Sequence, residues 1–314
     1  MKHLLLLLLL APACARPVRP ESRPPRILGI AHMALFVSDL ARARTFYRDF
    51  LGFDEVFTLP KPDGSDRIAF IKINDDQYLE LFHEPPRQDG RVYHISFYTD
   101  DAEGLRRALG GRGVKVPDKV GTGKIGNSQF GVTDPDGHGV ELVQYQPTGW
   151  TVRERGKHLP ADRVSSRVAH LGVLAGSLGA SLDFYRRLGF QETWRGGPSA
   201  KQLSWVNLRV PDGDDYLELM LYDELPPPDQ RGGKNHVCLM VPDVAAAVAR
   251  LEARPARGQY PRSIEVKVGV NRKRQANLFD PDGTRIELME NVPDLSLMAP
   301  EAAAALTDRF EPPA

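Results

Sequence analysis

The 314-residue sequence has only two cysteines, Cys14 and Cys238, and no excess of charge of either sign. If Cys14 leaves with an N-terminal signal, Cys238 has no partner and the chain forms no intramolecular disulfide. Cys238 lies in the apolar run HVCLMV, which predicts a buried structural thiol. Lys plus Arg and Asp plus Glu both number 41. This balance gives no indication of binding to nucleic acid or to an anionic membrane.

The sequence also lacks an apolar run long enough to span a bilayer, which needs roughly 20 residues. The run LLLLLLLA follows a Lys-His start and precedes small residues that offer cleavage after Ala13 or Ala15. This pattern predicts a cleaved export signal over residues 1–15 and hence a periplasmic or extracellular protein. Lipid attachment to Cys14 is the second choice, because Ala11 stands where the usual lipobox has leucine.

A chain of this length suggests two domains. Composition and periodicity predict a Pro- and Arg-rich disordered leader, a first domain, a polar linker, a second domain and a C-terminal tail. The expected ranges are 16–26, 27–147, 148–166, 167–291 and 292–314.

Each domain is expected to contain two units, in the order strand, helix and three strands. The first unit has the strand ILGIAHMALFV, the helix DLARARTFYRDFLGF, a weak strand DEVFTL, and the strands DRIAFIKIN and QYLELFHE. The second has RVYHISFYT, the helix DDAEGLRRALGGRG, and the strands GNSQFGVTD and GVELVQY. The third and fourth units begin at Val168 and Asn235.

The two halves repeat each other at fixed spacings. His32 and Glu80 are 48 residues apart, as are His170 and Glu218, and the turn DPDG occurs once in each half. An internal repeat of this kind constrains the fold more than any single motif does.

Each unit places one histidine in its first strand and one glutamate in its last strand. In YLELF, for example, Glu80 shares a face with Tyr78 and Phe82, because side chains alternate along a strand. A lone carboxylate among apolar residues is costly unless it is paired or bound to a cation. The eight residues are His32, His94, His170, His236, Glu80, Glu141, Glu218 and Glu287.

A single histidine or glutamate in a strand is ordinarily a structural residue. Eight of them at matching positions need eight separate structural explanations, whereas two metal sites explain all of them. Two imidazoles and two carboxylates suit a divalent transition metal that keeps positions open for water or substrate. Ni, Zn, Co, Mn and Fe all accept this donor set, so the sequence does not identify the metal.

The motifs HMALFVSDLARARTFYRDFLGF, YLELF, DPDGHGVELVQY and DPDGTRIELME resemble the vicinal oxygen chelate (VOC) superfamily. This superfamily contains glyoxalase I, fosfomycin resistance proteins, bleomycin-binding proteins, methylmalonyl-CoA epimerase and extradiol dioxygenases. The resemblance covers most of residues 27–291 and implies an α+β fold, in which four βαβββ units form two curved mixed β-sheet domains.

By position, the resemblance implies two metal ligand sets. They are His32, Glu80, His94 and Glu141, and His170, Glu218, His236 and Glu287. Units that pair across the halves are an alternative, which regroups the same eight ligands.

The two-His, two-Glu set is similar to that of the glyoxalase I and epimerase branch. In that branch a metal stabilises an enediolate, and a ligand glutamate moves a proton between adjacent carbons. Glu141 and Glu287 are therefore the predicted catalytic bases, with Glu80 and Glu218 second. The resemblance implies an exported, divalent-metal-dependent isomerase or lyase that acts through a metal-bound enediolate on a small oxygenated substrate. We do not expect lactoylglutathione, because an exported protein seldom meets glutathione.

Two alternatives stay open. An extradiol dioxygenase would hold Fe(II) on His170, His236 and Glu287. However, the His and Tyr that this group carries before its D-P-x-G turn are missing from GVNRKRQANLFDPDG, and Glu218 is an extra carboxylate. A small-molecule binding or sequestration protein needs a cleft but no ligand set, so two intact quartets argue against it.

A small-molecule substrate is the expected partner, with no nucleic acid and no membrane span, and four units in one chain are compatible with a monomer. We expect His83 and His138 to be exposed. Candidates for the walls of the cleft are Asn127, Gln129, Trp205 and Asn207, and candidates for binding an anionic group are Arg272, Lys273 and Arg274.

Overall fold

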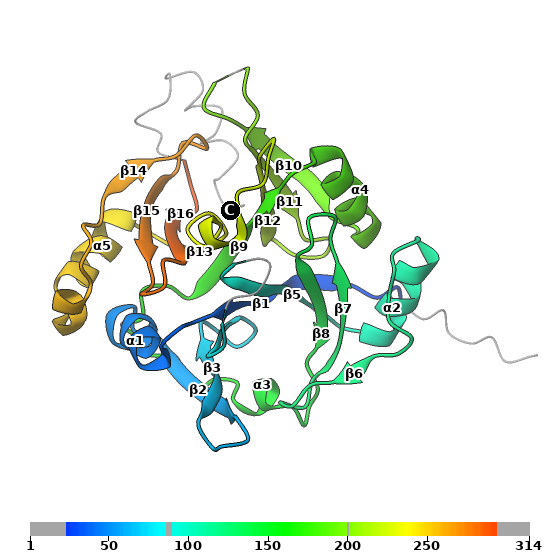
Figure 1. The fold of residues 1–314 in the computed structure, drawn as a ribbon, viewed down its shortest axis with the longest axis horizontal. Coiled ribbons are helices and arrows are strands. Elements are labelled where there is room, and N and C mark those ends of the chain that lie inside the picture. Colours follow the sequence, from blue (N-terminus) through cyan, green and yellow to red (C-terminus); the bar gives the residue numbers. More distant parts are fainter. Residues whose placement is uncertain (1–22, 86–89, 200, 294–314) are drawn as a thin grey trace, which may run out of the picture.

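The computed structural model describes residues 23–85, 90–199 and 201–293, which form two eight-stranded mixed sheets (Figure 1). The strand orders are β2-β3-β4-β1-β5-β8-β7-β6 and β10-β11-β12-β9-β13-β16-β15-β14. The two orders match strand for strand, which confirms the predicted fold class. The predicted signal, residues 16–22 of the leader and residues 294–314 of the tail lie outside the described residues.

The first sheet and its helices are formed by residues 27–144. The strands are β1 (Ile27–Phe36), β2 (Asp54–Pro60), β3 (Asp66–Lys72), β4 (Tyr78–Phe82), β5 (Val92–Thr99), β6 (Gly121–Thr122), β7 (Ser128–Thr133) and β8 (Gly139–Gln144). The helices are α1 (Leu40–Arg44) and α2 (Ala102–Gly111). The expected first helix continues from α1 as a π-helical turn, η1 (Thr45–Phe50), in which Leu51 donates its amide to the carbonyl of Phe46.

The second sheet follows a short linker helix, α3 (Trp150–Arg153). The strands are β9 (Arg167–Ala175), β10 (Gln191–Gly196), β11 (Trp205–Arg209), β12 (Tyr216–Leu221), β13 (His236–Val241), β14 (Val266–Val268), β15 (Arg274–Phe279) and β16 (Arg285–Glu290). The helical segments are α4 (Leu178–Leu188), η2 (Pro228–Gln230), α5 (Val244–Glu252) and η3 (Pro255–Gln259). No helix in the described part of the chain is long and apolar enough to cross a membrane.

Polar caps fix where the helices begin. The carboxylate of Asp101 accepts from the amide of Gly104 at 2.8 Å, and that of Asp243 accepts from Ala246 at 2.8 Å. Such caps satisfy amides that have no partner within the helix. Helix α4 ends at Gly189, whose φ of 99° is a left-handed conformation that favours glycine.

The units pair within each half. β1 runs parallel to β4 and antiparallel to β5, and β5 runs parallel to β8. The second half repeats this with β9, β12, β13 and β16. Both units of a half therefore contribute central strands to one sheet, so the grouping of units across the halves does not occur.

The helical segments, in contrast, pack across the halves. The ring of Phe50 in η1 stacks on Tyr260, which follows η3, with ring centroids 4.8 Å apart. Likewise, the hydroxyl of Tyr185 in α4 donates to Asp134 of the first half at 3.0 Å. These contacts between a helical segment of one half and residues of the other join the halves into one body.

Candidate metal centre

Four adjacent strands, β4, β1, β5 and β8, place the first predicted ligand set on one face of the sheet. Glu80 of β4 and His94 of β5 both pair with Ala34 of β1, which lies two residues after His32. Ser96 of β5 pairs with both His32 and Glu141. Since alternate residues of a strand share a face, all four ligand candidates point to the same side.

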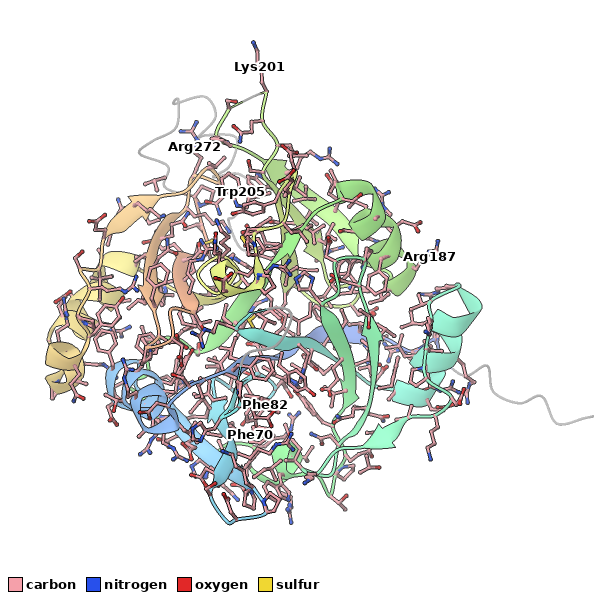
Figure 2. All side chains as sticks on the ribbon, viewed as in Figure 1. Phe70, Phe82, Arg187, Lys201, Trp205 and Arg272 are labelled. Atoms are coloured by element: carbon pink, nitrogen blue, oxygen red, sulfur yellow. The ribbon has the colours of Figure 1, made fainter. Side chains whose placement is uncertain are left out.

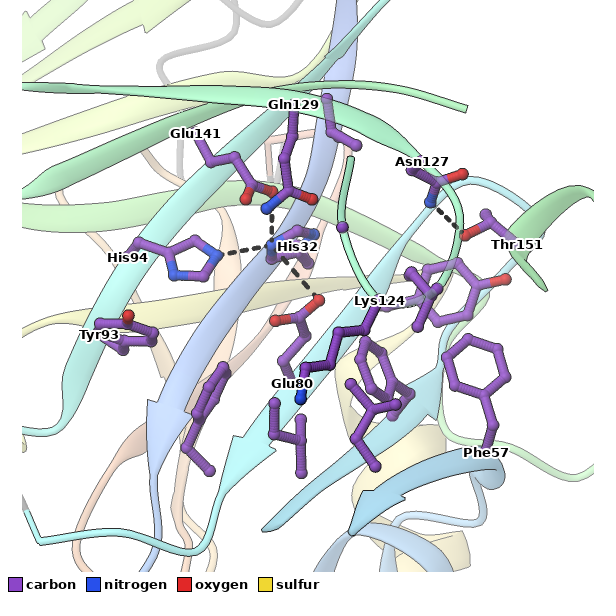
Figure 3. Close-up of a pocket in the computed structure, with 18 of the residues that line it drawn as sticks. His32, Phe57, Glu80, Tyr93, His94, Lys124, Asn127, Gln129, Glu141 and Thr151 are labelled. Carbon is purple, nitrogen blue, oxygen red and sulfur yellow. Dashed lines mark hydrogen bonds and ion pairs between the residues drawn. The ribbon is translucent and has the colours of Figure 1, made fainter. Parts of the chain in front are cut away.

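The four side chains converge on one ring nitrogen (Figure 3). Nε2 of His32 lies 2.8 Å from Nε2 of His94, 3.4 Å from Oε1 of Glu141 and 3.6 Å from Oε1 of Glu80. All four residues line one cavity of about 290 Å³. The structure therefore brings the first predicted set together, while its role as a ligand set stays a prediction.

Burial keeps both histidines of this set neutral. It lowers the pKa of His94 to about 4. Burial, together with the charge of His94, also lowers the pKa of His32. Neutral imidazoles retain lone pairs, as metal ligands must.

The two carboxylates lack a compensating cation. Burial raises the pKa of Glu141 to about 7, and burial together with the charge of Glu141 raises that of Glu80. Within the described residues, the only basic side chain at ion-pair distance from these carboxylates is His32, whose ring is neutral. Two neutral imidazoles beside two uncompensated buried carboxylates fit a divalent metal ion.

Two small residues support this arrangement. The hydroxyl of Ser96 donates to Oε1 of Glu141 at 3.1 Å, which works against the rise in the pKa of that carboxyl. Gly139 lies beside His94, because a Cβ at residue 139 would be 3.2 Å from the Cβ of His94. The absence of a side chain there leaves room for the histidine.

Aromatic side chains form much of the cavity wall. Figure 2 shows two of them, Phe70 and Phe82, inside the first half. Asn127 and Gln129 line the cavity as predicted, and so does Lys124, which the sequence analysis did not single out. The aromatic residues of the wall are Phe57, Phe70, Tyr78, Phe82, Tyr93 and Tyr145.

The second predicted set also comes together. Nε2 of His236 lies 2.9 Å from Nε2 of His170, 3.2 Å from Oε2 of Glu287 and 3.6 Å from Oε1 of Glu218. Burial raises the pKa of Glu218 to about 8. Burial also acts to raise the pKa of Glu287, but the hydrogen bond from His236 and the nearby guanidinium of Arg285 hold that pKa below its usual range.

The other cleft candidates lie at different places. Trp205 lines a second cavity of about 250 Å³, beside Glu218 and Glu287. Asn207 is buried, and its Oδ1 has no hydrogen-bond partner among the residues that the structure describes. Arg272 is exposed at the outer edge of the molecule in Figure 2, in a left-handed turn with φ 63°.

The expected exposure of His138 is wrong. Its side chain is 1% exposed, and its Nδ1 lies 2.9 Å from Oδ2 of Asp134. The DPDG turn is covered by Tyr185, which donates to the same carboxylate, so His138 is enclosed. His83 is half-buried rather than exposed. Cys238 is buried and free, as predicted.

Comparison with known families gives one match that covers both halves. The model of the Glyoxalase/Bleomycin resistance protein/Dioxygenase superfamily matches residues 29–142 and 167–288. These two segments correspond to the two sheets.

Relatives of known name include two lactoylglutathione lyases. The protein of Haemophilus influenzae is 30% identical over 127 residues, which are 38% of this chain and 94% of the relative. The protein of Schizosaccharomyces pombe is 27% identical over 232 residues, which are 68% of this chain and 70% of the relative.

Two solved structures share the fold. Homoprotocatechuate 2,3-dioxygenase from Brevibacterium fuscum has a TM-score of 0.63 at 19% identity, over 86% of this chain and 73% of its own. The Mn(II)-bound glyoxalase from Novosphingobium aromaticivorans has a TM-score of 0.61 at 18% identity, over 85% of this chain and 83% of its own. At these identities the likeness concerns the fold alone.

Proposed function

The chain belongs to the Glyoxalase/Bleomycin resistance protein/Dioxygenase superfamily, and from this we propose that it is a divalent-metal-dependent isomerase or lyase of the glyoxalase I type. The observation that carries the proposal is the convergence of His94, Glu80 and Glu141 on Nε2 of His32 in one cavity. Export, proposed from the N-terminal segment alone, is part of the same hypothesis.

In the proposed mechanism, His32, Glu80, His94 and Glu141 would hold the divalent metal, which would supply Lewis acidity to the bound substrate. Glu141 takes a proton from one carbon and returns it to the adjacent carbon. In the metal-free chain, burial raises the pKa of Glu141 to about 7. A general base works best when its pKa lies near the operating pH. Ser96 keeps this carboxylate aimed by its hydrogen bond to Oε1.

The cavity walls indicate the class of substrate. A cavity of about 290 Å³ lined by aromatic rings favours a small substrate with an apolar or flat group beside its two oxygens. Lys124 and Asn127 also line it, while Arg67 is paired with Glu84 at 2.6 Å. We therefore propose a small oxygenated carbon acid, rather than a bulky peptide conjugate, as the substrate.

The test combines a metal count with a proton-exchange assay. The purified mature chain is reconstituted with Mn, Fe, Co, Ni or Zn, dialysed and analysed for metal. It is then incubated in D₂O with α-hydroxyketones, hemithioacetals and α-branched thioesters, and loss of the C–H signal is followed by proton NMR. Exchange that needs the metal and stops in Glu141→Gln supports the proposal.

Glu192→Gln is the matched control, because Glu192 pairs with Arg195 away from the cavity. The proposal is wrong if none of the five metals binds, or if Glu141→Gln exchanges protons as fast as the control.

Ring cleavage is the alternative enzyme function, since His170, His236 and Glu287 come within reach of one another as three ligands would. It predicts bound iron, oxygen consumption with catechols and loss of both in His170→Ala. A sequestration protein would instead bind its ligand without metal and without proton exchange.

A further inference from the structure

Arg285 distinguishes the second set from the first. It stands in β16 two residues before Glu287, where the first half has Gly139 two residues before Glu141. Its Nη2 contacts Nδ1 of His236 and lies 3.2 Å from the carbonyl oxygen of Lys234. A guanidinium donates hydrogen bonds and cannot accept them, so Nδ1 of His236 must be the acceptor.

This contact fixes the tautomer of His236. An imidazole whose Nδ1 accepts a hydrogen bond is neutral and carries its single proton on Nε2. That nitrogen faces Oε2 of Glu287 at 3.2 Å and Nε2 of His170 at 2.9 Å. A metal ligand needs the opposite tautomer, with a lone pair on Nε2 and a proton donated from Nδ1 to an acceptor. The carbonyl oxygen of Lys234 lies 3.2 Å from Nδ1 and is the acceptor that such a proton would use. In the structure, this oxygen accepts from Arg285.

Both carboxylate oxygens of Glu287 have hydrogen-bond donors without a cation. Its Oε2 accepts from His236, and its Oε1 accepts at 2.9 Å from the amide of Gln275 when the nitrogen of that amide faces it. In the first half, the recorded partners of Glu141 are Ser96 and His32. The first carboxylate has no counterpart of Arg285 near it, because Gly139 stands at that position.

A second glycine shows that the His236 ring sits differently. A Cβ at Gly172 of β9 would lie 1.9 Å from Cε1 of His236. The first half has Ala34 at the corresponding position, opposite His94. His236 therefore occupies space that a side chain fills in the first half, and Arg285 occupies space that Gly139 leaves open.

Access to the two histidine pairs differs as well. His32 and His94 both line the first cavity. His170 and His236 are 1% and 0% exposed and do not line the second cavity, although Arg285 does.

We propose, on the basis of the proposed function, that the chain holds metal only in the first half, and that the guanidinium of Arg285 takes the place of the cation in the second. The second centre is then a metal-free site, in which the fixed positive charge of Arg285 lies against His236. Its two histidines and two glutamates persist as a hydrogen-bonded cluster under the second cavity.

Metal stoichiometry tests this inference. After reconstitution with Mn(II) and dialysis, we expect about one equivalent in the natural chain, none in His32→Ala and about one in His170→Ala. Arg285→Gly, which installs the residue of the first half, should raise the count towards two equivalents. Lys267→Ala is the matched control, because it removes a positive charge from the same cavity without touching His236.

A direct measurement of the tautomer does not depend on how the variants fold. In the natural chain labelled with ¹⁵N-histidine, the imidazole nitrogen shifts should show a bare Nδ1 and a protonated Nε2 for His236. A protonated Nδ1 overturns the inference. So do two equivalents of metal of which one is lost in His170→Ala, an outcome that leaves the proposed function intact. A chain that binds no metal overturns the proposed function and the contrast between the halves with it.

Discussion

The hydroxyl of Tyr47 in the first half donates to Oδ2 of Asp280 in the second half at 3.1 Å. With the halves exchanged, the hydroxyl of Tyr185 in the second half donates to Oδ2 of Asp134 in the first half at 3.0 Å. Both tyrosines are fully buried. Tyr47 and Tyr185, each from a helical segment of its own half, therefore dock on the DPDG turn of the opposite half.

Removal of either hydroxyl should loosen the junction between the halves. Tyr47→Phe leaves a buried carboxylate without its donor, so we expect the free energy of unfolding to fall by about 1 to 3 kcal/mol. Tyr185→Phe should have a similar effect. Urea denaturation measures both, with Arg48→Ala on the exposed side of the same turn as the control. Unchanged midpoints in both phenylalanine variants would show that the bonds carry no stability.

Asp280 gives this junction a dependence on pH. Burial raises the pKa of Asp280 to about 6, despite hydrogen bonds from Thr284 and Tyr47 that lower it. The folded state therefore favours the protonated carboxyl. The raised pKa of Asp280 adds at most about 3 kcal/mol to the free energy of unfolding. This contribution is fully present below about pH 4 and is lost as the pH rises through about 6.

Asp280→Asn should remove this trend while it keeps an oxygen to accept from the amides of Asp282 and Thr284. The measurement is the difference in unfolding free energy between the natural chain and the variant across this pH range. A difference that does not vary with pH would contradict the prediction.

Ser96 should tune the proposed base without holding the metal. Its hydrogen bond lowers the pKa of Glu141, so Ser96→Ala should raise that pKa further and shift the acidic limb of the rate profile to higher pH. We expect the rate of proton exchange near pH 7 to fall by about tenfold, and the metal count to stay unchanged. A fall in rate with an unmoved pH profile would indicate a purely structural role for Ser96.

Much of the architecture follows from the sequence because both halves keep the same order of motifs, although the two histidines are 62 residues apart in the first half and 66 in the second. Equal spacing from His32 to Glu80 and from His170 to Glu218 requires the same strand order in both halves, and the structure has it. The alternation in YLELF also placed Glu80 correctly on the cavity face. Period and alternation are local properties, so a single sequence reveals them.

The differences between the halves depend on contacts that the repeat conceals. The exchange of Gly139 for Arg285 is visible in the two DPDG motifs, but only the fold shows that the guanidinium reaches His236. His138 looks like an exposed turn residue until Tyr185 from the other half covers it. Side chains that meet across the sheets or the halves leave no periodic signal in the sequence.

The export hypothesis makes a prediction about the mature chain. Expression of the full sequence in a secreting host should give a protein cleaved after Ala13 or Ala15, because small residues follow the apolar run there. Intact-mass spectrometry of the secreted protein decides between the two sites. A mass increase from a lipid on Cys14 would favour anchoring, and an uncleaved intracellular chain would contradict export.

Glu80 should affect the metal-free and metal-bound proteins in opposite directions. Burial and the neighbouring charge of Glu141 raise its pKa, so its ionised form is a cost to the folded chain without metal. Glu80→Gln should therefore stabilise the metal-free protein by about 1 kcal/mol at mildly alkaline pH, because it removes a buried charge of like sign.

In the natural chain, metal at about 100 times its Kd should add about 2.7 kcal/mol to the free energy of unfolding, and a chelator should reverse this gain. The gain should shrink in Glu80→Gln and vanish in His32→Ala, as measured by urea unfolding with and without metal. If Glu80→Gln destabilises both forms equally, Glu80 is a structural residue of β4 and the first set has at most three ligands.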